Sequence, residues 1–304
     1  MRILLTGVTG YVGGRLAPRL LADGHELRGF ARGAMRVDPG FPVLAGDAVS
    51  GRGLAEALDG VEVAYYLIHS MEPAANGSFD LNERSAAVNF AAVAREAGVR
   101  RIVYLGGPVP ETSTPSLHLA SRLAVEQILL EATDESVAFR ASIVIGAGSR
   151  SFRFLVRLIE RMPVLLVPAW RVNSSAPIDE RDAIEMLARA ATSDRVAGCS
   201  LDLAGPDVVS YGDLIERIRD WMLVGRPVIG FHHLTVTPIA SHISAVIAGE
   251  EHALIGPLME SLSDDLLPRD DRAVELLGVR RHSLDAAIER ALREWELTEP
   301  LAAR

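Results

Sequence analysis

Lysine is absent from this sequence of 304 residues, and all 31 residues counted as lysine or arginine are arginines. A chain without lysine cannot form a Schiff base, and it has no ammonium group that could lower the pKa of a neighbouring side chain. Any cationic contact to a ligand must therefore come from arginine or from protonated histidine.

Cysteine occurs once, as Cys199. A single thiol can form neither an intramolecular disulfide nor a metal site built from several cysteines. Because Cys199 stands in the short apolar run CSLDLAG, which is typical of a strand, we expect a buried structural thiol.

Long apolar runs are also missing, since none approaches the roughly 20 residues that a membrane span needs. The first residues, MRILLTG, lead directly into an expected strand and do not follow the charged-then-apolar order of a signal peptide. We therefore expect a cytoplasmic protein without a transmembrane segment.

Clustered positive charge is the fourth feature that is lacking. The formal net charge is −9 and the arginines are scattered, whereas nucleic-acid binding needs clustered cations. The doublet Arg100–Arg101 beside an expected strand is interpreted as a solvated edge. With 49% hydrophobic and 23% charged residues, the composition is that of a globular protein able to bury a large core.

The first half of the chain alternates short apolar runs with helical patterns. This order predicts an α/β fold with a doubly wound, mostly parallel sheet that helices cover on both faces. Strands are expected at 2–6, 26–31, 41–47, 61–68, 100–107 and 137–146, and helices at 11–24, 53–60, 80–98 and 117–132.

The second half is less regular. Helices are expected at 151–162, 180–192 and 283–297, the last with Ser283 as its N-cap, whereas 227–267 is apolar and only partly helical. There is no internal repeat and no long linker. We expect residues 1–150 to form a Rossmann core and residues 151–304 a smaller C-terminal lobe with segments that complete the sheet, all in one compact body.

A glycine-rich loop, TGVTGYVGG, follows the first expected strand and opens the first expected helix. Glycines at this spacing allow a tight turn and a close approach to a pyrophosphate, which the helix N-terminus binds through its amides. The loop therefore predicts a dinucleotide site. The cofactor contacts expected from this loop are Thr6, Gly7, Thr9, Gly10, Tyr11, Val12 and Gly13.

The end of the second expected strand indicates which dinucleotide is bound. Sites for NAD usually carry an acidic residue there, whereas this sequence has Arg32, with Arg36 close by. Since an arginine fork suits a 2′-phosphate, the pattern favours NADP (NADPH) over NAD. Asp47 is predicted to accept from the adenine amino group, with turn formation as its alternative role, and Leu67 is the last expected cofactor contact.

These motifs resemble the short-chain dehydrogenase/reductase superfamily, in particular its atypical, extended-type members near the NmrA-like and epimerase/dehydratase-like branches. The resemblance covers nearly the whole chain and implies a Rossmann fold that binds NAD(P). It rests on TGVTGYVG, similar to the TGxxGxxG motif, on VLAGDAVSGRGLAEALDGVEVAYYL and AREAGVRRIVYLGG, and on APIDERDAIEMLARA and LDLAGPDVVSYGDLIERI.

The departures from the family pattern lie at the catalytic positions. The family serine falls near Gly107, and the family Tyr-x-x-x-Lys becomes His118 and Arg122. Positions i and i+4 share one face of a helix, and histidine exchanges protons near neutral pH. We predict that His118 acts as acid or base, while Arg122 holds the nicotinamide ribose and favours neutral imidazole. The alternative is a histidine without chemistry beside an arginine that only grips the ribose.

Further substrate contacts are predicted at the carboxyl edge of the sheet, where open parallel sheets bind ligands. Tyr66 lies near the end of the fourth expected strand, His69 follows that strand, and Ser142 lies in the sixth. Gly107 completes this group. Strand packing is the alternative for Tyr66, a loop position for His69 and strand-end polarity for Ser142. No metal site is predicted, because the run 231–233, FHH, has no acidic partner at ligand spacing.

Two functions remain open. The first is an NADPH-dependent enzyme that reduces a carbonyl or an activated double bond of an apolar small molecule, with the proton delivered by His118 or by water. The second is a sensor that binds NADP(H) without turnover, as the NmrA-like resemblance implies and as the replaced catalytic residues support. We favour the enzyme, with a small-molecule partner and no nucleic acid, and the chain could form a homodimer.

Overall fold

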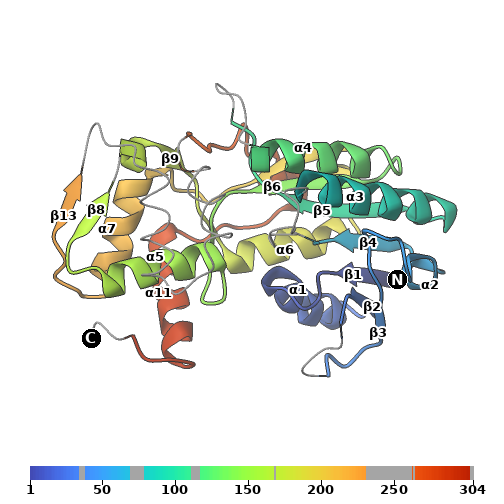
Figure 1. Ribbon diagram of the computed structural model, residues 1–304, viewed down its shortest axis with the longest axis horizontal. Helices are drawn as coiled ribbons and strands as arrows, with labels where there is room; N and C mark the ends of the chain where they lie inside the picture. The colour runs from blue at the N-terminus through green and yellow to red at the C-terminus, as the bar shows by residue number, and fades with distance from the viewer. Residues whose placement is uncertain are drawn as a thin grey trace.

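A computed structural model describes residues 1–33, 38–68, 79–110, 117–167, 169–230, 262 and 264–301, with backbone alone at 79–80, 117–118, 166 and 230. In this part of the chain, a seven-stranded sheet has the order β11-β6-β5-β4-β1-β2-β3 (Figure 1). All neighbouring strands in it run parallel. The expected doubly wound α/β fold is confirmed.

The strands of this sheet are short and mostly buried. They are β1 (Arg2–Thr6), β2 (Glu26–Ala31), β3 (Val43–Ala45), β4 (Val63–Tyr66), β5 (Arg101–Gly106), β6 (Val137–Ala141) and β11 (Ser200–Leu203). All residues of β4 and β5 are buried, which is why these strands carry continuous apolar runs and not an alternating pattern.

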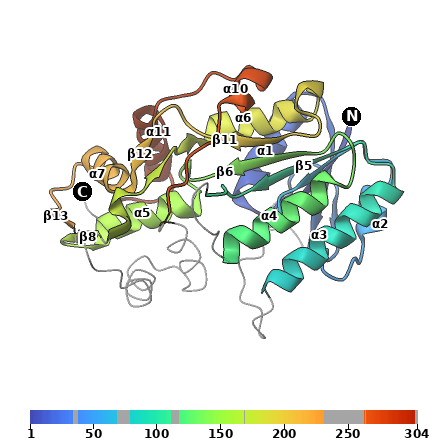
Figure 2. The same cartoon turned by 90° about the horizontal axis from the view of Figure 1, so that it is seen from above.

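Helices cover both faces of the sheet, as Figure 2 shows from above. One face carries α1 (Tyr11–Ala22), α6 (Glu180–Ala190) and α10 (Arg272–Leu277), whose apolar side chains pack with those of β1 and β6 in one core. The other carries α2 (Leu54–Leu58), α3 (Phe79–Glu96) and α4 (Leu117–Leu130), which enclose a second core.

The prediction of one continuous strand over 137–146 is wrong, because the structure has two shorter strands there. After β6 the chain leaves the main sheet, and β7 (Val144–Ile145) pairs in parallel with β10 (Ile178–Asp179). An uninterrupted apolar run gives no sign of this break, because a change of pairing partner is a tertiary event. The break matters, since it directs the chain from the sheet edge into the C-terminal lobe.

The C-terminal lobe surrounds a third apolar core that includes Phe152, Ile218 and Trp295. Ser283 caps α11 by accepting from the amide of Ala286 at 3.4 Å, as expected, and Asp179 caps α6. The elements of this part are α5 (Arg150–Arg161), β8 (Leu165–Val167), η1 (Ala169–Val172), β9 (Ser174–Ser175), η2 (Asp194–Val196), β12 (Val209–Ser210), α7 (Tyr211–Trp221), β13 (Val228–Gly230) and α11 (Leu284–Glu296).

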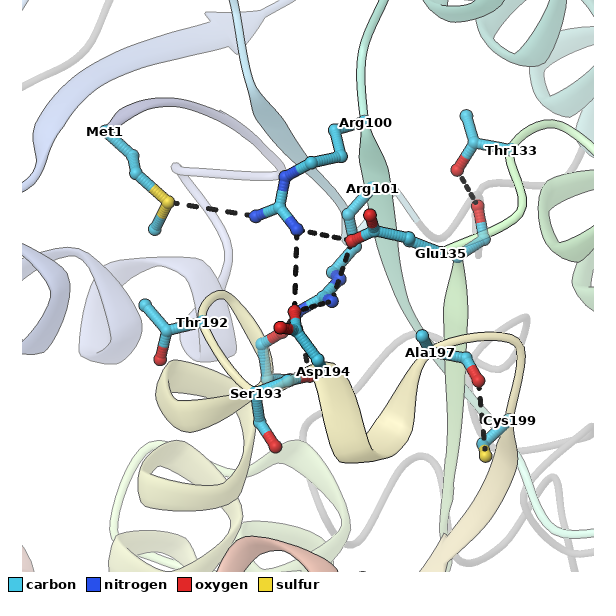
Figure 3. Close-up of polar contacts among 12 residues, drawn as sticks. Met1, Arg100, Arg101, Thr133, Glu135, Thr192, Ser193, Asp194, Ala197 and Cys199 are labelled. Carbon is cyan, nitrogen blue, oxygen red and sulfur yellow. Dashed lines mark hydrogen bonds and ion pairs between the residues drawn. The ribbon is translucent and has the colours of Figure 1, made fainter.

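The interpretation of Arg100–Arg101 as a solvated edge is wrong for Arg101, which is 0% exposed at the start of β5. Its guanidinium donates to the carbonyls of Ala190 and Ser193 at 2.7 and 3.0 Å and to Glu135 at 2.9 Å (Figure 3). An arginine can be buried in this way because its donors reach the free carbonyls at the end of α6.

Cys199 lies just before β11 and is partly buried, so the expected full burial is not observed. Its thiol donates to the carbonyl of Ala197 at 3.6 Å (Figure 3). None of the helices described in the structure combines the length and the apolar character that crossing a bilayer requires.

Candidate functional site

A cavity of about 530 Å³ opens over the carboxyl ends of β1, β2 and β4, at the edge where parallel sheets bind ligands. Its volume is within the range of small-molecule sites. The predicted cofactor contacts that line it are Gly7, Thr9, Gly10, Tyr11, Val12, Gly13, Arg32, Asp47 and Leu67, and Tyr66 lines it as well.

The glycine loop has the shape that its spacing predicts. Gly7 has a φ of +65°, and a Cβ there would lie 2.5 Å from the carbonyl oxygen of Leu67. A Cβ on Gly13 would lie 2.3 Å from the carbonyl oxygen of Gly7. Only glycine therefore fits at either position, and the loop brings the N-terminus of α1 close to the sheet, where Gly10 to Gly13 line the cavity.

Thr6 has a different place from the one predicted. It is fully buried and does not line the cavity. Its hydroxyl donates to the carbonyl of Tyr65 at 2.9 Å and accepts from the amide of Leu67 at 3.0 Å. Thr6 thus ties the end of β1 to the end of β4 and fixes the floor of the site.

Arg32 and Asp47, which follow β2 and β3, form the end of the cavity beyond these two strands. Asp47 accepts from the amide of Val49 at 3.0 Å and from the hydroxyl of Ser50 at 3.2 Å. Its alternative role in a turn is therefore observed, although its carboxylate also borders the cavity. Arg36 lies outside the residues that the structure describes.

Two positions that are catalytic in the family that this sequence resembles lie next to each other, between β5 and α4. A Cβ on Gly107 would lie 3.7 Å from Cδ of Arg122, so these two predicted residues are neighbours. Arg122 is only 8% exposed and is not part of the cavity lining, which α4 reaches through Val125. His118 is in the first turn of α4, one turn before Arg122, but its side chain lies outside the described residues.

Two buried polar residues at this end were not predicted. Glu83 on α3 lines the cavity and accepts from the hydroxyl of Ser121 at 2.8 Å, and Tyr104 on β5 lines it too. The Tyr104 hydroxyl donates to the carbonyl of Arg122 at 3.3 Å. Sequence patterns conceal both, since Glu83 belongs to an amphipathic helix and Tyr104 to an apolar strand.

The tyrosines in the cavity wall are held neutral. Burial raises the pKa of Tyr66, and burial raises that of Tyr104 in spite of the opposing positive charge of Arg122. Tyr66 packs edge-on against Phe90, with ring centroids 5.0 Å apart. Burial thus makes both phenols weaker acids than a free tyrosine.

Ser142, another predicted substrate contact, does not line the large cavity. Ser142 donates to the carbonyl of Ala176 at 3.4 Å and lines a separate, small cavity that also contacts Arg140 and Asp202. His69 and the histidines of the 231–233 run lie outside the described residues.

The connection between β7 and α5 forms a wall of the cavity that the sequence did not indicate. Gly148 and Arg150 line the cavity beside the glycine loop. Since glycine and arginine are both frequent in loops, no sequence signal separates them from their neighbours. The site thus draws on the C-terminal lobe as well as on the Rossmann core.

Comparison with known proteins agrees with this geometry. Residues 7–142 match the family described as NAD(P)H-binding. A 3-beta-hydroxysteroid dehydrogenase of Mycolicibacterium neoaurum is 31% identical over 113 residues, covering 34% of this chain and 31% of the relative. A 2-alkyl-3-oxoalkanoate reductase of Stenotrophomonas maltophilia is 27% identical over 195 residues, covering 53% of this chain and 56% of the relative. The chain thus spans between a third and somewhat more than half the length of these relatives.

A similar fold occurs in a nucleoside-diphosphate-sugar epimerase from Staphylococcus aureus. Its crystal structure matches 95% of this chain and 100% of the epimerase with a TM-score of 0.77 at 14% identity. The chain therefore contains an NAD(P)-binding Rossmann domain. The same fold is found in an NAD-dependent NDP-hexosamine 5,6-dehydratase, which matches 99% of this chain with a TM-score of 0.72 at 18% identity, so the fold expected from the sequence resemblance is observed.

Proposed function

We propose that the protein binds NADP(H) in the 530 Å³ cavity and uses it to reduce a carbonyl or an activated double bond of an apolar small molecule. The single observation that supports NADP(H) over NAD is that Arg32 borders the cavity directly after β2. An arginine in this place complements a 2′-phosphate, whereas the acidic residue usual in NAD sites would repel it.

The C-terminal lobe supports an apolar substrate. The core of this lobe is apolar and aromatic, with Ile143, Phe154 and Trp170 among its side chains, although the void of about 10 Å³ that they enclose is too small for a substrate. Two of the matched relatives are named for a hydroxysteroid and for a 2-alkyl-3-oxoalkanoate. We therefore assign substrate binding to the part of the chain after residue 150.

The chemistry that we propose uses the residues of α4. The reduced nicotinamide supplies a hydride to the electrophilic carbon. His118 as imidazolium delivers a proton to the substrate oxygen or to the α-carbon and is left as neutral imidazole, while Arg122 holds the ribose. Gly107 has no hydroxyl at the position where the family carries a serine. His118 therefore also makes the substrate contact that this serine would make.

The test is consumption of NADPH by the purified protein with a panel of alkyl ketones, 3-oxo esters and enones, followed by the absorbance of the reduced nicotinamide. We expect turnover that falls about 100-fold or more in His118→Ala, with unchanged NADPH affinity. His25→Ala, near the amino end of β2, is the matched control and should keep full turnover. If wild type binds NADPH but consumes it with no substrate of the panel, the reductase is contradicted and the sensor function is favoured.

The proposal includes a cytoplasmic protein that acts on a small molecule. It also includes a homodimer, for which Leu81 and Val88, 66% and 45% exposed on α3, offer an apolar contact.

A further inference from the structure

We propose that Arg150 binds the pyrophosphate of the dinucleotide, so that the C-terminal lobe supplies the positive charge that the glycine loop lacks. This inference rests on the proposed cofactor site and adds a residue to it. It concerns the part of the ligand that NAD and NADP share, and is therefore independent of the choice between them.

The need for such a charge follows from the composition of the site. The chain has no lysine, and the cavity lining that the structure describes contains two arginines, Arg32 and Arg150. Arg32 lies at the end of the cavity beyond β2, which the proposed function assigns to the 2′-phosphate. A pyrophosphate carries two negative charges, and within a partly enclosed cavity their neutralisation by a cation is strongly favoured.

Neither of the two arginines on α1 is available for this role, since Arg19, in its last turn, pairs with Asp23 and Glu185. Arg15 lies in the first turns of α1, but its guanidinium forms ion pairs with Glu180 at 3.3 Å and with Glu294. These carboxylates neutralise it. The amides of the glycine loop therefore face the ligand without a neighbouring side-chain cation from their own helix.

The position of Arg150 follows from close packing between the β7–α5 connection and the glycine loop. A Cβ on Gly148 would lie 2.7 Å from Cδ2 of Tyr11, and a Cβ on Gly146 would collide with the Tyr11 hydroxyl. Only a glycine backbone can lie this close to the ring. The connection is thus pressed against the glycine loop, and Arg150 follows Gly148 by two residues.

The backbone that carries Arg150 is firmly held. The amide of Ser149 donates to the carbonyl of Gly146 at 3.0 Å, and the amide of Arg153 donates to that of Ser149 at 2.8 Å. One turn into α5, the Arg153 guanidinium lies 4.1 Å from the centre of the Trp295 ring and pairs with Glu299 at 2.6 Å. The base of the Arg150 side chain is therefore fixed before any ligand binds.

The Arg150 side chain itself is exposed, and it forms no hydrogen bond or ion pair with any residue that the structure describes. The first turn of α5 contains no acidic residue that would compete for it. A cation without a protein partner, on a fixed helix end and in the wall of the cofactor cavity, is placed to bind a ligand anion.

The experiment compares the dissociation constants of NADPH and NADH for wild type, Arg150→Gln, Arg150→Lys and Arg32→Gln. Because both nucleotides carry the pyrophosphate, we expect Arg150→Gln to weaken both by about tenfold and to leave their ratio unchanged. Arg150→Lys should recover part of the loss. Arg32→Gln should instead change the ratio by weakening NADPH alone. Arg217→Gln, on α7, serves as the control.

The outcomes separate this inference from the proposed function. If Arg150→Gln binds both nucleotides as wild type does, the role of Arg150 is wrong while the cofactor site stands. If only NADPH binding is weakened, Arg150 contacts the 2′-phosphate and the inference is also wrong. If wild type binds neither nucleotide, the inference fails together with the proposed function. The melting temperature without ligand should be unchanged in Arg150→Gln, which shows that any loss is not caused by unfolding.

Discussion

Tyr11 is the residue that joins the cofactor loop to the C-terminal lobe. Its hydroxyl donates to Glu180, the first residue of α6, and Arg15 and Arg290 approach the same carboxylate at 3.3 and 3.5 Å. Burial and the hydrogen bond to Glu180 raise the pKa of Tyr11. The phenol therefore stays a neutral donor, and its ring packs between the glycine loop and the Gly146–Gly148 connection.

Replacing Tyr11 by phenylalanine keeps the ring but removes the donor to a buried carboxylate. We expect Tyr11→Phe to lower the free energy of unfolding by about 1–3 kcal/mol and to weaken NADPH binding several-fold. Urea unfolding and calorimetric titration measure the two effects. Tyr65→Phe is the control, since Tyr65 donates to the carbonyl of Leu187 at 2.7 Å and does not line the cavity, so it should lose stability alone. Wild-type binding and stability in Tyr11→Phe would contradict this role.

At the residue scale, the sequence predicts contacts that depend on the shape of the backbone better than contacts that depend on how side chains pack. The glycine loop is found correctly because its spacing reflects steric needs that only glycine meets. Glu83 and Tyr104 are missed because burial of a polar side chain depends on residues far away in the chain, such as Ser121 and Arg122. The adjacency of Gly107 and Arg122 follows from the family pattern, whereas their detailed packing does not.

At the scale of elements, β5 is fastened to the end of α6 by Arg101 (Figure 3). Arg101→Met would leave the carbonyls of Ala190 and Ser193 without this donor and the carboxylate of Glu135 without its buried partner. We expect a loss of about 3 kcal/mol in the free energy of unfolding, measured in urea.

The neighbouring residue provides the control for Arg101. Arg100 also pairs with Glu135, but its side chain is 37% exposed, so Arg100→Met should cost less than about 1 kcal/mol. Equal losses in the two variants would show that burial of Arg101 is not what holds β5 to α6.

A second element, β11, carries a carboxyl group that makes stability depend on pH. Burial raises the pKa of Asp202 from 3.8 to about 6. Because the folded protein binds this proton more tightly than the unfolded chain does, the contribution of Asp202 to stability is greatest below pH 4 and falls as the pH rises to about 6. Above that range the contribution no longer changes.

The amide in Asp202→Asn cannot titrate, yet it can still accept from the amide of Arg269, which donates to Asp202 at 2.8 Å. We expect the variant to gain stability relative to wild type between pH 4 and pH 6, by about 1–3 kcal/mol in total. Unfolding measured at several pH values tests this. The exposed Asp220→Asn should show no such difference, and a constant offset between Asp202→Asn and wild type would contradict the account.

The elements themselves could largely be predicted. The bounds of α5, α6 and α11 agree with the sequence within two residues, because apolar periodicity and caps such as Ser283 define them locally. The division of 137–146 into β6 and β7 could not be predicted, since it depends on the pairing of β7 with β10, more than thirty residues later.

At the scale of the whole molecule, the two halves of the chain are interleaved. The late strand β11 completes the sheet beside β6, and α6 packs on α1 through Arg19 and Glu185, 2.8 Å apart. Glu180 reaches the glycine loop from the second half of the chain, and Gly148 reaches it from just before α5. The described residues that line the cavity extend along the chain only as far as Arg150, the first residue of α5, so a ligand there contacts the second half only where α5 begins. Its binding should stabilise the folded chain.

The most direct test of this account is a calorimetric titration of the purified wild-type protein with NADPH and, separately, with NADH. The account predicts saturable binding of both, with NADPH bound more tightly, and a preference that disappears in Arg32→Gln. Equal affinity for the two nucleotides in wild type would contradict the assignment of Arg32 to the 2′-phosphate. Absence of binding by both at millimolar concentration would contradict the cofactor site itself.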